Sequence, residues 1–377
     1  MLKPQRSVWS ILPAAGILVA ASLALAVTAS GAAAAPSLTQ VPSFGSNPGN
    51  LTMYSYLPAT LGPGAPLVVA LHGCTQSASD YYSHSGWPQL ADRGGFALVF
   101  PQQASANNSQ QCFNWYTPSK DGRGQGEAAS VMSMVTYAEA QYGVDPARVF
   151  VTGLSAGGGM TSDLLADYPD VFAGGAIDSG LPAQCASSLS EASTCQYNDR
   201  KLTPGQWAQK VYDSHPGYSG PWPRVAIWQG SADFTVYPVN ASEERDQWTQ
   251  VWGIGQAASS TRSLPGGTTE STYNDSRGQP AVALFSISGM GHGLAVAPGP
   301  APDQCGSTGA YFLDYICSTY HTALFWGLDV GGYTYADGSN QSPRLAQVDS
   351  VRARTAALAT AGWTTASRAR RAVSWPR

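Results

Sequence analysis

The sequence has few charged residues and few histidines. Asp, Glu, Lys and Arg together make up 12% of the 377 residues, the formal net charge is −4, and only five histidines are present. A nucleic-acid-binding protein needs a basic surface, so this balance argues against a nucleic-acid partner. Beyond residue 27 the chain also lacks an apolar run long enough to span a membrane. We therefore expect a mature protein without a membrane partner, and we expect it to be a monomer.

The one long apolar run, residues 11–27, has the layout of a secretion signal. Lys3 and Arg6 precede it, and the small residues GAAAAP follow it at 31–36. This order predicts a signal peptide over residues 1–35 and an extracellular protein. A retained membrane anchor is the alternative, although the run is short for a span.

Export allows the six cysteines to be interpreted as disulfides. No C-x-x-C or H-x-x-x-H spacing accompanies them, so the sequence does not indicate a metal site. Short separations favour two local bridges and leave a third pair: Cys185–Cys195, Cys305–Cys317 and Cys74–Cys112. Buried free thiols are the alternative.

The chain divides by composition into a body and a tail. Residues 331–377 are rich in Gly, Ser and Ala and hold seven Arg against two Asp, whereas the body has more acidic than basic residues. We expect one folded catalytic domain over residues 36–330, followed by an Arg-rich, disordered tail over 331–377.

Apolar runs alternate with helical patterns along the body. The runs have the length and composition of buried strands and lie at 67–71, 96–100 (halted by Pro101), 149–152, 225–228 and 281–285. Helical spacing of apolar residues occurs at 131–138, 160–165, 243–252 and 319–328. This alternation predicts an α/β fold with a mostly parallel central sheet covered by helices on both faces. Residues 36–66 are expected to add an edge hairpin.

Residues 153–157 read GLSAG and match the G-x-S-x-G motif. The motif follows an apolar strand and precedes a helical pattern, which is the setting of the nucleophile elbow of α/β-hydrolases. Ser155 is therefore the candidate nucleophile, and the backbone N–H of Ala156 is a candidate oxyanion donor. The alternative is a Gly-rich turn in which Ser155 only caps the helix.

An α/β-hydrolase orders its triad as Ser, then acid, then His. Asp233 follows the strand at 225–228 and is the favoured acid; Asp178 is its main rival, and Asp199 and Asp303 are weaker ones. His292, in the loop GMGHG at 289–293, is the candidate base. His72 precedes the serine and has the wrong order. The others are expected to be surface or packing residues, with His84 and His215 in polar loops and His321 in the final helix.

The loop that follows the strand at 67–71 is the expected source of a second oxyanion donor. The backbone N–H of Cys74 is the first candidate and that of Thr75 the second. A Cys74–Cys112 bridge would bring Trp115 close to this loop, where it could stack on a sugar or aromatic ring or simply pack in the core.

Several separated blocks resemble the secreted feruloyl and acetylxylan esterases (carbohydrate esterase family 1) grouped with extracellular polyhydroxybutyrate depolymerases. The blocks lie at 71–76, 90–92, 112–115, 149–157, 168–175, 228–233 and 289–293. The resemblance implies an α/β-hydrolase with the triad Ser155, Asp233 and His292 and without a metal or organic cofactor. It also implies substrate contacts at Asn114 and at Gln229, which stands where many relatives have His.

The resemblance leaves the substrate open between acylated xylan and a polyester. Segments 203–208 and 215–220 are similar to acetylxylan esterases, whereas 305–317 is similar to the depolymerases. Such depolymerases usually continue into a linker and a substrate-binding module, where this chain has its Arg-rich tail. We favour removal of acetyl or feruloyl groups from xylan, with polyhydroxyalkanoate hydrolysis second. An acyltransferase and a non-catalytic glycan-binding protein are further alternatives.

Overall fold

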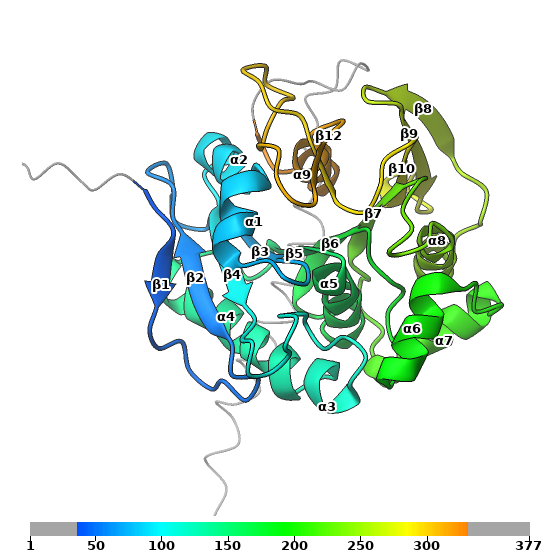
Figure 1. Ribbon diagram of the computed structural model, residues 1–377, viewed down its shortest axis with the longest axis horizontal. Helices are drawn as coiled ribbons and strands as arrows, with labels where there is room; N and C mark the ends of the chain where they lie inside the picture. Colours follow the sequence, from blue (N-terminus) through cyan, green and yellow to red (C-terminus); the bar gives the residue numbers. More distant parts are fainter. Residues whose placement is uncertain (1–35, 331–377) are drawn as a thin grey trace, which may run out of the picture. The chain divides into compact units, whose positions relative to one another are not determined.

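The computed structural model describes residues 36–330, so the predicted signal peptide (1–35) and tail (331–377) lie outside the described residues. Ten strands form one sheet, in the order β1-β2-β4-β3-β5-β6-β7-β10-β9-β8 (Figure 1). Their bounds are β1 Thr39–Val41, β2 Thr52–Tyr56, β3 Leu67–Leu71, β4 Ala97–Gln102, β5 Val149–Leu154, β6 Phe172–Asp178, β7 Arg224–Gly230, β8 Ser260–Leu264, β9 Thr268–Asn274 and β10 Pro280–Ile287. A separate parallel pair consists of β11 Leu294–Val296 and β12 Phe312–Asp314.

The six central strands of the large sheet, from β4 to β10, run parallel. The pairs β1–β2 and β2–β4 at one edge and β10–β9 and β9–β8 at the other are antiparallel. The carboxyl ends of the parallel strands meet at one edge of the sheet, where α/β proteins place their sites. The mostly parallel sheet and the edge hairpin of residues 36–66 are therefore confirmed.

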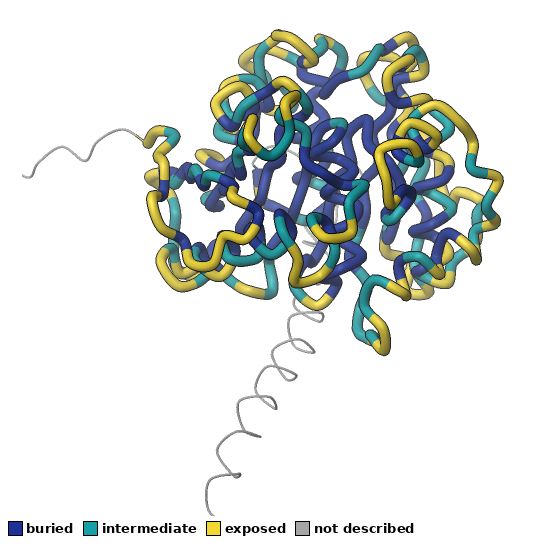
Figure 2. Tube along the Cα trace, turned by 60° about the horizontal axis from the view of Figure 1, so that its bottom comes forward, coloured by how far each residue is buried: buried dark blue, intermediate teal, exposed yellow. Residues whose placement is uncertain are grey.

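Helices cover both faces of the sheet, as predicted. Their bounds are α1 Ala78–His84, α2 Trp87–Gly94, α3 Pro118–Asp121, α4 Gly126–Tyr142, α5 Ala156–Asp167, α6 Leu189–Tyr197, α7 Pro204–Ser214, α8 Val239–Val251 and α9 Ser318–Trp326. Leu67 and Val69 of β3 share one core with α4, α5, α7 and α8, whereas Val68 and Ala70 share the other with α1, α2 and α9. In Figure 2 the buried residues gather in the middle of the domain, and the exposed residues lie mostly in the segments around them. Among the described residues, no helix is both long and apolar enough to cross a membrane.

Some elements differ from the sequence expectations. Pro101 does not halt its strand, because β4 runs on to Gln102 beside β2 after its pairing with β3 has ended at Val99. The sequence did not predict the hairpin β8–β9 or the helices α6 and α7, because these segments have no clear periodic pattern of apolar residues. Their residues are largely polar, and packing against the domain supplies what the local pattern lacks.

Three buried carboxyl groups lie on α3 and α5. Asp121, Asp163 and Asp167 are each about 1% exposed, and each has one carboxyl oxygen without a hydrogen-bond partner among the described residues. Burial, together with the neighbouring Asp121, raises the pKa of Asp167 to about 8. Burial likewise raises the pKa of Asp121 to about 6 and that of Asp163 above its usual range. These carboxyl groups therefore favour the protonated form in the folded state.

This cluster predicts that stability falls as the pH rises. Below pH 4 both states hold the Asp167 proton; between about pH 4 and 8 only the folded state holds it, so unfolding releases a proton and the free energy of unfolding drops. We expect a lower urea midpoint at pH 8 than at pH 5.5. Asp167→Asn should flatten this dependence, whereas a midpoint that rises with pH in the wild-type chain would contradict the assignment.

Candidate active site

Ser155 stands in the tight turn between β5 and α5. Its backbone has φ 59° and ψ −118°, a strained conformation for a non-glycine residue, and its N–H donates to the Asp178 carbonyl oxygen at 2.9 Å. A Cβ on Gly157 would lie 2.6 Å from the carbonyl oxygens of Leu71 and His72, so only glycine fits there. This turn is the nucleophile elbow that the GLSAG motif predicts.

Two backbone N–H groups are available near Ser155. Ala156 opens α5, and the structure gives its N–H no partner among the described residues. The same holds for Cys74, whereas the N–H of Thr75 donates to the Gln110 carbonyl oxygen at 2.6 Å. Cys74 is therefore the better candidate of the two that the sequence offered.

His72 holds the Cys74 loop from behind. Its Nε2 accepts the backbone N–H of Gln103 at 3.1 Å, so the ring proton is on Nδ1, which lies 2.7 Å from the Gly73 carbonyl oxygen. Burial lowers the pKa of His72 to about 4, and the neutral ring is the form that makes both bonds. His72 is a positioning residue, a role that sequence order did not reveal.

The structure forms all three predicted disulfides: Cys74–Cys112, Cys185–Cys195 and Cys305–Cys317. The first ties the loop after β3 to the loop that carries Trp115. Over residues 36–330, no group of three or more His, Cys, Asp or Glu side chains is arranged to hold a metal ion.

Asp233 and His292 meet beyond the ends of β7 and β10. His292 Nδ1 lies 2.8 Å from Asp233 Oδ2. The other carboxylate oxygen, Oδ1, accepts the backbone N–H groups of Thr235 and Val236, each at 2.8 Å. Asp233 is fully buried, and these donors compensate the desolvation of its charge.

Asp178 is placed differently, although it lies at the end of the neighbouring strand β6. Its carboxylate accepts the Thr152 hydroxyl at 2.9 Å, and burial raises its pKa to about 7. Its side chain has no bond to His292 among the described contacts. The geometry therefore favours Asp233 as the acid beside His292.

Two cavities open at Ser155. One, of about 140 Å³, is lined by Ser155, His292, Cys74 and Tyr311; the other, of about 400 Å³, is lined by Ser155, Ala156, Trp115 and Leu189 among others. Gln196 lines both. The structure thus brings together the candidate nucleophile, the candidate base and both candidate oxyanion donors.

The remaining histidines line neither cavity. His84 is the last residue of α1, where the sequence suggested a loop, and its Nδ1 lies 2.8 Å from the Ser307 hydroxyl. His215 follows α7 and packs edge-on against Tyr218. His321 lies in α9, where burial lowers its pKa to about 4. They are packing and surface residues, as expected.

The structure places two of the predicted substrate contacts, Gln229 and Asn114, outside the lining of the cavities at Ser155. Gln229 lies behind the site, not at its mouth: it is 3% exposed and its Nε2 donates to Asp233 Oδ2 at 3.2 Å and to the Val236 carbonyl oxygen. Asn114 is also buried, and its amide bonds to Glu127 and Asn108. Both side chains support the site without lining its cavities.

Trp115 packs in the core and also reaches the candidate site. It is 6% exposed and packs so closely on α5 that a Cβ on Gly159 would lie 2.7 Å from its indole. It nevertheless lines the larger cavity beside Ser155. Core packing therefore fixes one wall of that cavity.

Comparisons with known proteins agree with this geometry. Residues 51–272 match the family described as Esterase PHB depolymerase. A poly(3-hydroxyalkanoate) depolymerase C from Paucimonas lemoignei is 46% identical over 83% of this chain and 74% of its own length. A feruloyl esterase B from Talaromyces stipitatus is 38% identical over 73% of this chain and 77% of its own.

A solved structure adds support for the fold. The acetyl xylan esterase from Aspergillus awamori is 34% identical and has a TM-score of 0.63, covering 68% of this chain and 94% of that one. The α/β-hydrolase fold is therefore confirmed. On its sequence and its fold, the chain belongs to the Esterase PHB depolymerase family and is a carboxylic ester hydrolase.

Proposed function

We propose that the chain is a secreted serine ester hydrolase in which Ser155 is the nucleophile, His292 the general base and Asp233 the residue that orients it. The observation that carries the proposal is the 2.8 Å contact between His292 Nδ1 and Asp233 Oδ2, with His292 and Ser155 lining one cavity. These are the parts of an acyl-transfer triad in their usual order along the chain.

In this mechanism Asp233 accepts a hydrogen bond from the Nδ1–H of His292, which keeps the proton on Nδ1 and leaves Nε2 free as a base. Ser155 Oγ attacks the ester carbonyl carbon while Nε2 takes its proton, which then passes to the leaving alcohol. In the second half of the reaction a water molecule attacks the carbonyl carbon of the acyl-Ser155 while Nε2 takes its proton. That proton returns to Ser155 Oγ as the acid is released. The N–H groups of Cys74 and Ala156 stabilise the oxyanion in both steps.

Secretion is part of the proposal. In residues 1–35 basic residues precede an apolar run and small residues follow it, an order that fits a cleaved signal peptide. The three disulfides fit an oxidising compartment. The substrate is then an ester on a polymer outside the cell.

Two polymer classes fit the relatives. Acetylxylan and feruloyl esterases among them support removal of acetyl or feruloyl groups from xylan. The specific observation for a polyhydroxyalkanoate is the depolymerase relative, which is 46% identical over 83% of this chain.

A parallel assay on acetylated xylan, methyl ferulate and polyhydroxybutyrate particles tests the substrate class. We expect release of acetate, ferulate or hydroxybutyrate from at least one of the three, with Ser155→Ala as the inactive control. Turnover of none of them, in an enzyme that hydrolyses p-nitrophenyl acetate, would contradict both polymer assignments.

A further inference from the structure

A third cavity lies away from Ser155, on another face of helix α6. Its volume is about 530 Å³, larger than that of either cavity at Ser155. Most of the side chains that line it are polar, whereas Leu189 and Ala192 of α6 face the cavity at Ser155. We call it the polar cavity and define it by its six ionisable lining residues: Arg123, Asp167, Glu191, Arg200, Lys210 and Asp213.

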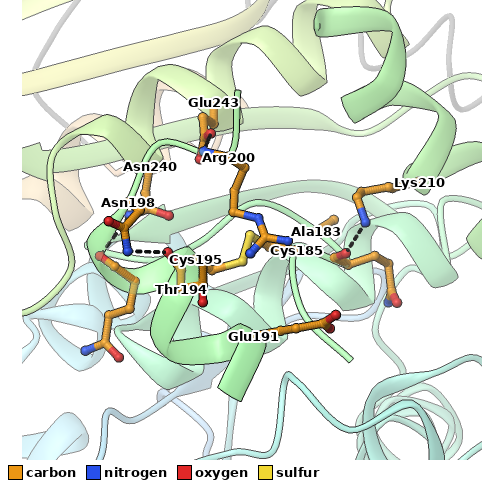
Figure 3. The surroundings of a disulfide bond; sticks show 12 residues. Ala183, Cys185, Glu191, Thr194, Cys195, Asn198, Arg200, Lys210, Asn240 and Glu243 are labelled. Atoms are coloured by element: carbon orange, nitrogen blue, oxygen red, sulfur yellow. Dashed lines mark hydrogen bonds between the residues drawn. A yellow bond between two sulfur atoms is a disulfide. The ribbon is translucent and has the colours of Figure 1, made fainter. Parts of the chain in front are cut away.

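Two cations line the polar cavity without a carboxylate partner. In the described part of the chain the Arg200 guanidinium has no ion pair or hydrogen bond, and the Lys210 ammonium donates to the Gln184 carbonyl oxygen, at 3.0 Å, and forms no ion pair. Figure 3 shows both side chains beside the Cys185–Cys195 disulfide. Burial and the nearby Arg200 lower the pKa of Lys210, so the two positive charges repel each other. An anion bound in the cavity would relieve this repulsion.

The other two groups near these cations leave that charge in place. Arg123, the third cation, is already paired, because it donates to both carboxylate oxygens of Asp170 at 2.8 and 2.9 Å. Burial and the neighbouring Asp121 raise the pKa of Asp167 to about 8, although Arg123 acts in the opposite direction. The Asp167 carboxyl group is therefore neutral in a mildly acidic solution and adds no negative charge to the lining.

Two carboxylates complete the lining. Glu191 Oε2 accepts the N–H and the hydroxyl of Ser187 at 2.8 and 2.7 Å, and Asp213 Oδ1 accepts the Gln209 amide at 2.8 Å. The second oxygen of each carboxylate has no partner among the described residues, so it can accept a hydrogen bond from a ligand hydroxyl. The same oxygens would repel a bare inorganic anion. The lining therefore suits a ligand that carries both a carboxylate and hydroxyl groups, which is the chemistry of a uronic acid.

The loop before α6 holds the wall of the polar cavity in a strained conformation. Gln184 has φ 56°, its N–H donates to Asp163 at 2.8 Å, and its carbonyl oxygen accepts the Lys210 ammonium. The Cys185–Cys195 bridge ties the same loop to α6. Strained residues persist only where their surroundings fix them, and they cluster at ligand sites. A cavity that is already formed costs little conformational entropy when a ligand binds.

We propose that the polar cavity binds a carboxylate-bearing sugar residue of an acidic polysaccharide. Arg200 and Lys210 bind the carboxylate, and Glu191 and Asp213 accept hydrogen bonds from the sugar hydroxyls. The site is separate from Ser155, so this inference goes beyond the proposed ester hydrolysis. Because a helix is about 10 Å across, a polymer held here also lies close to the cavity on the other face of α6. Binding would then raise the local concentration of esters on that polymer at Ser155.

Calorimetric titration with two xylo-oligosaccharides of equal length tests the site. One carries a single glucuronic acid and the other is neutral. The protein is the Ser155→Ala chain at about pH 6, where no ester chemistry intervenes and Asp167 is protonated. We expect a Kd about tenfold lower for the acidic oligosaccharide, because hydrogen bonds to a charged group are the stronger ones.

Removing the two unpaired cations should abolish this preference. In the Arg200→Met and Lys210→Met double variant the acidic oligosaccharide should bind no more tightly than the neutral one. Arg200→Met alone should reduce the preference, and it keeps the test open if the double variant does not fold, since the guanidinium has no partner to lose. Lys201→Met is the matched control: it removes a positive charge from the next position, but Lys201 pairs with Asp199 and lines none of the three cavities. It should bind like the parent.

Several results would overturn the proposal. These are no measurable binding of the acidic oligosaccharide, equal affinity of the parent for both oligosaccharides, or a full preference in Arg200→Met. Inorganic phosphate that competes with an equal or lower Kd would indicate a general anion site and overturn the assignment to a sugar. A wild-type chain that does not hydrolyse p-nitrophenyl acetate would contradict only the proposed function, because the titration uses the inactive parent.

Discussion

Ser155→Ala is expected to lower kcat for p-nitrophenyl acetate by roughly 10⁴- to 10⁶-fold. The substitution removes the only hydroxyl that stands at the strained turn between β5 and α5, beside the unpaired N–H of Ala156. The fold should be unaffected, because the backbone N–H of Ser155 keeps its bond to Asp178. Initial rates at saturating substrate measure the effect.

Ser193→Ala is the matched control for this experiment. Ser193 lines the same larger cavity as Ser155 but lies on α6, away from the elbow. It should retain near wild-type activity. If the two alanine variants were equally active, Ser155 would not be the nucleophile.

Asp233→Asn is expected to lower kcat roughly 10⁴-fold. The oxygen of the new amide must face the N–H groups of Thr235 and Val236, which both donate to Oδ1. The amide NH₂ then faces His292 Nδ1, where a carboxylate oxygen lay at 2.8 Å. His292 is forced into the tautomer with its proton on Nε2, which cannot accept the proton of Ser155.

Asp178→Asn distinguishes this explanation from a general cost of losing a buried carboxylate. Burial raises the pKa of Asp178 to about 7, so an amide resembles the protonated side chain that accepts the Thr152 hydroxyl. Activity should stay near the wild-type rate. A loss of activity in Asp178→Asn, with Asp233→Asn unimpaired, would reverse the assignment of the acid.

The parts of the site that sequence could predict are those with local signals. Ser155 sits between an apolar strand and a helical pattern, and Asp233 and His292 each follow an apolar strand, so their order and spacing indicated one edge of a parallel sheet. The cysteine spacings carried similar information, and all three bridges follow it.

The parts that sequence could not predict depend on side-chain direction in three dimensions. Gln229 lies within the block at 228–233 that includes Asp233, yet its amide turns inward to the carboxylate of Asp233. Asn114 precedes Trp115, yet only Trp115 reaches the cavity.

Covalent labelling tests the central claim most directly. A fluorophosphonate reacts with an activated serine and leaves a stable adduct, which peptide mass spectrometry locates. Progressive inactivation should be matched by one adduct per chain, on the peptide that contains Ser155, and Asp233→Asn should slow its formation. Complete inactivation with Ser155 unmodified, or an adduct on another residue, would contradict the assignment of Ser155 as the nucleophile.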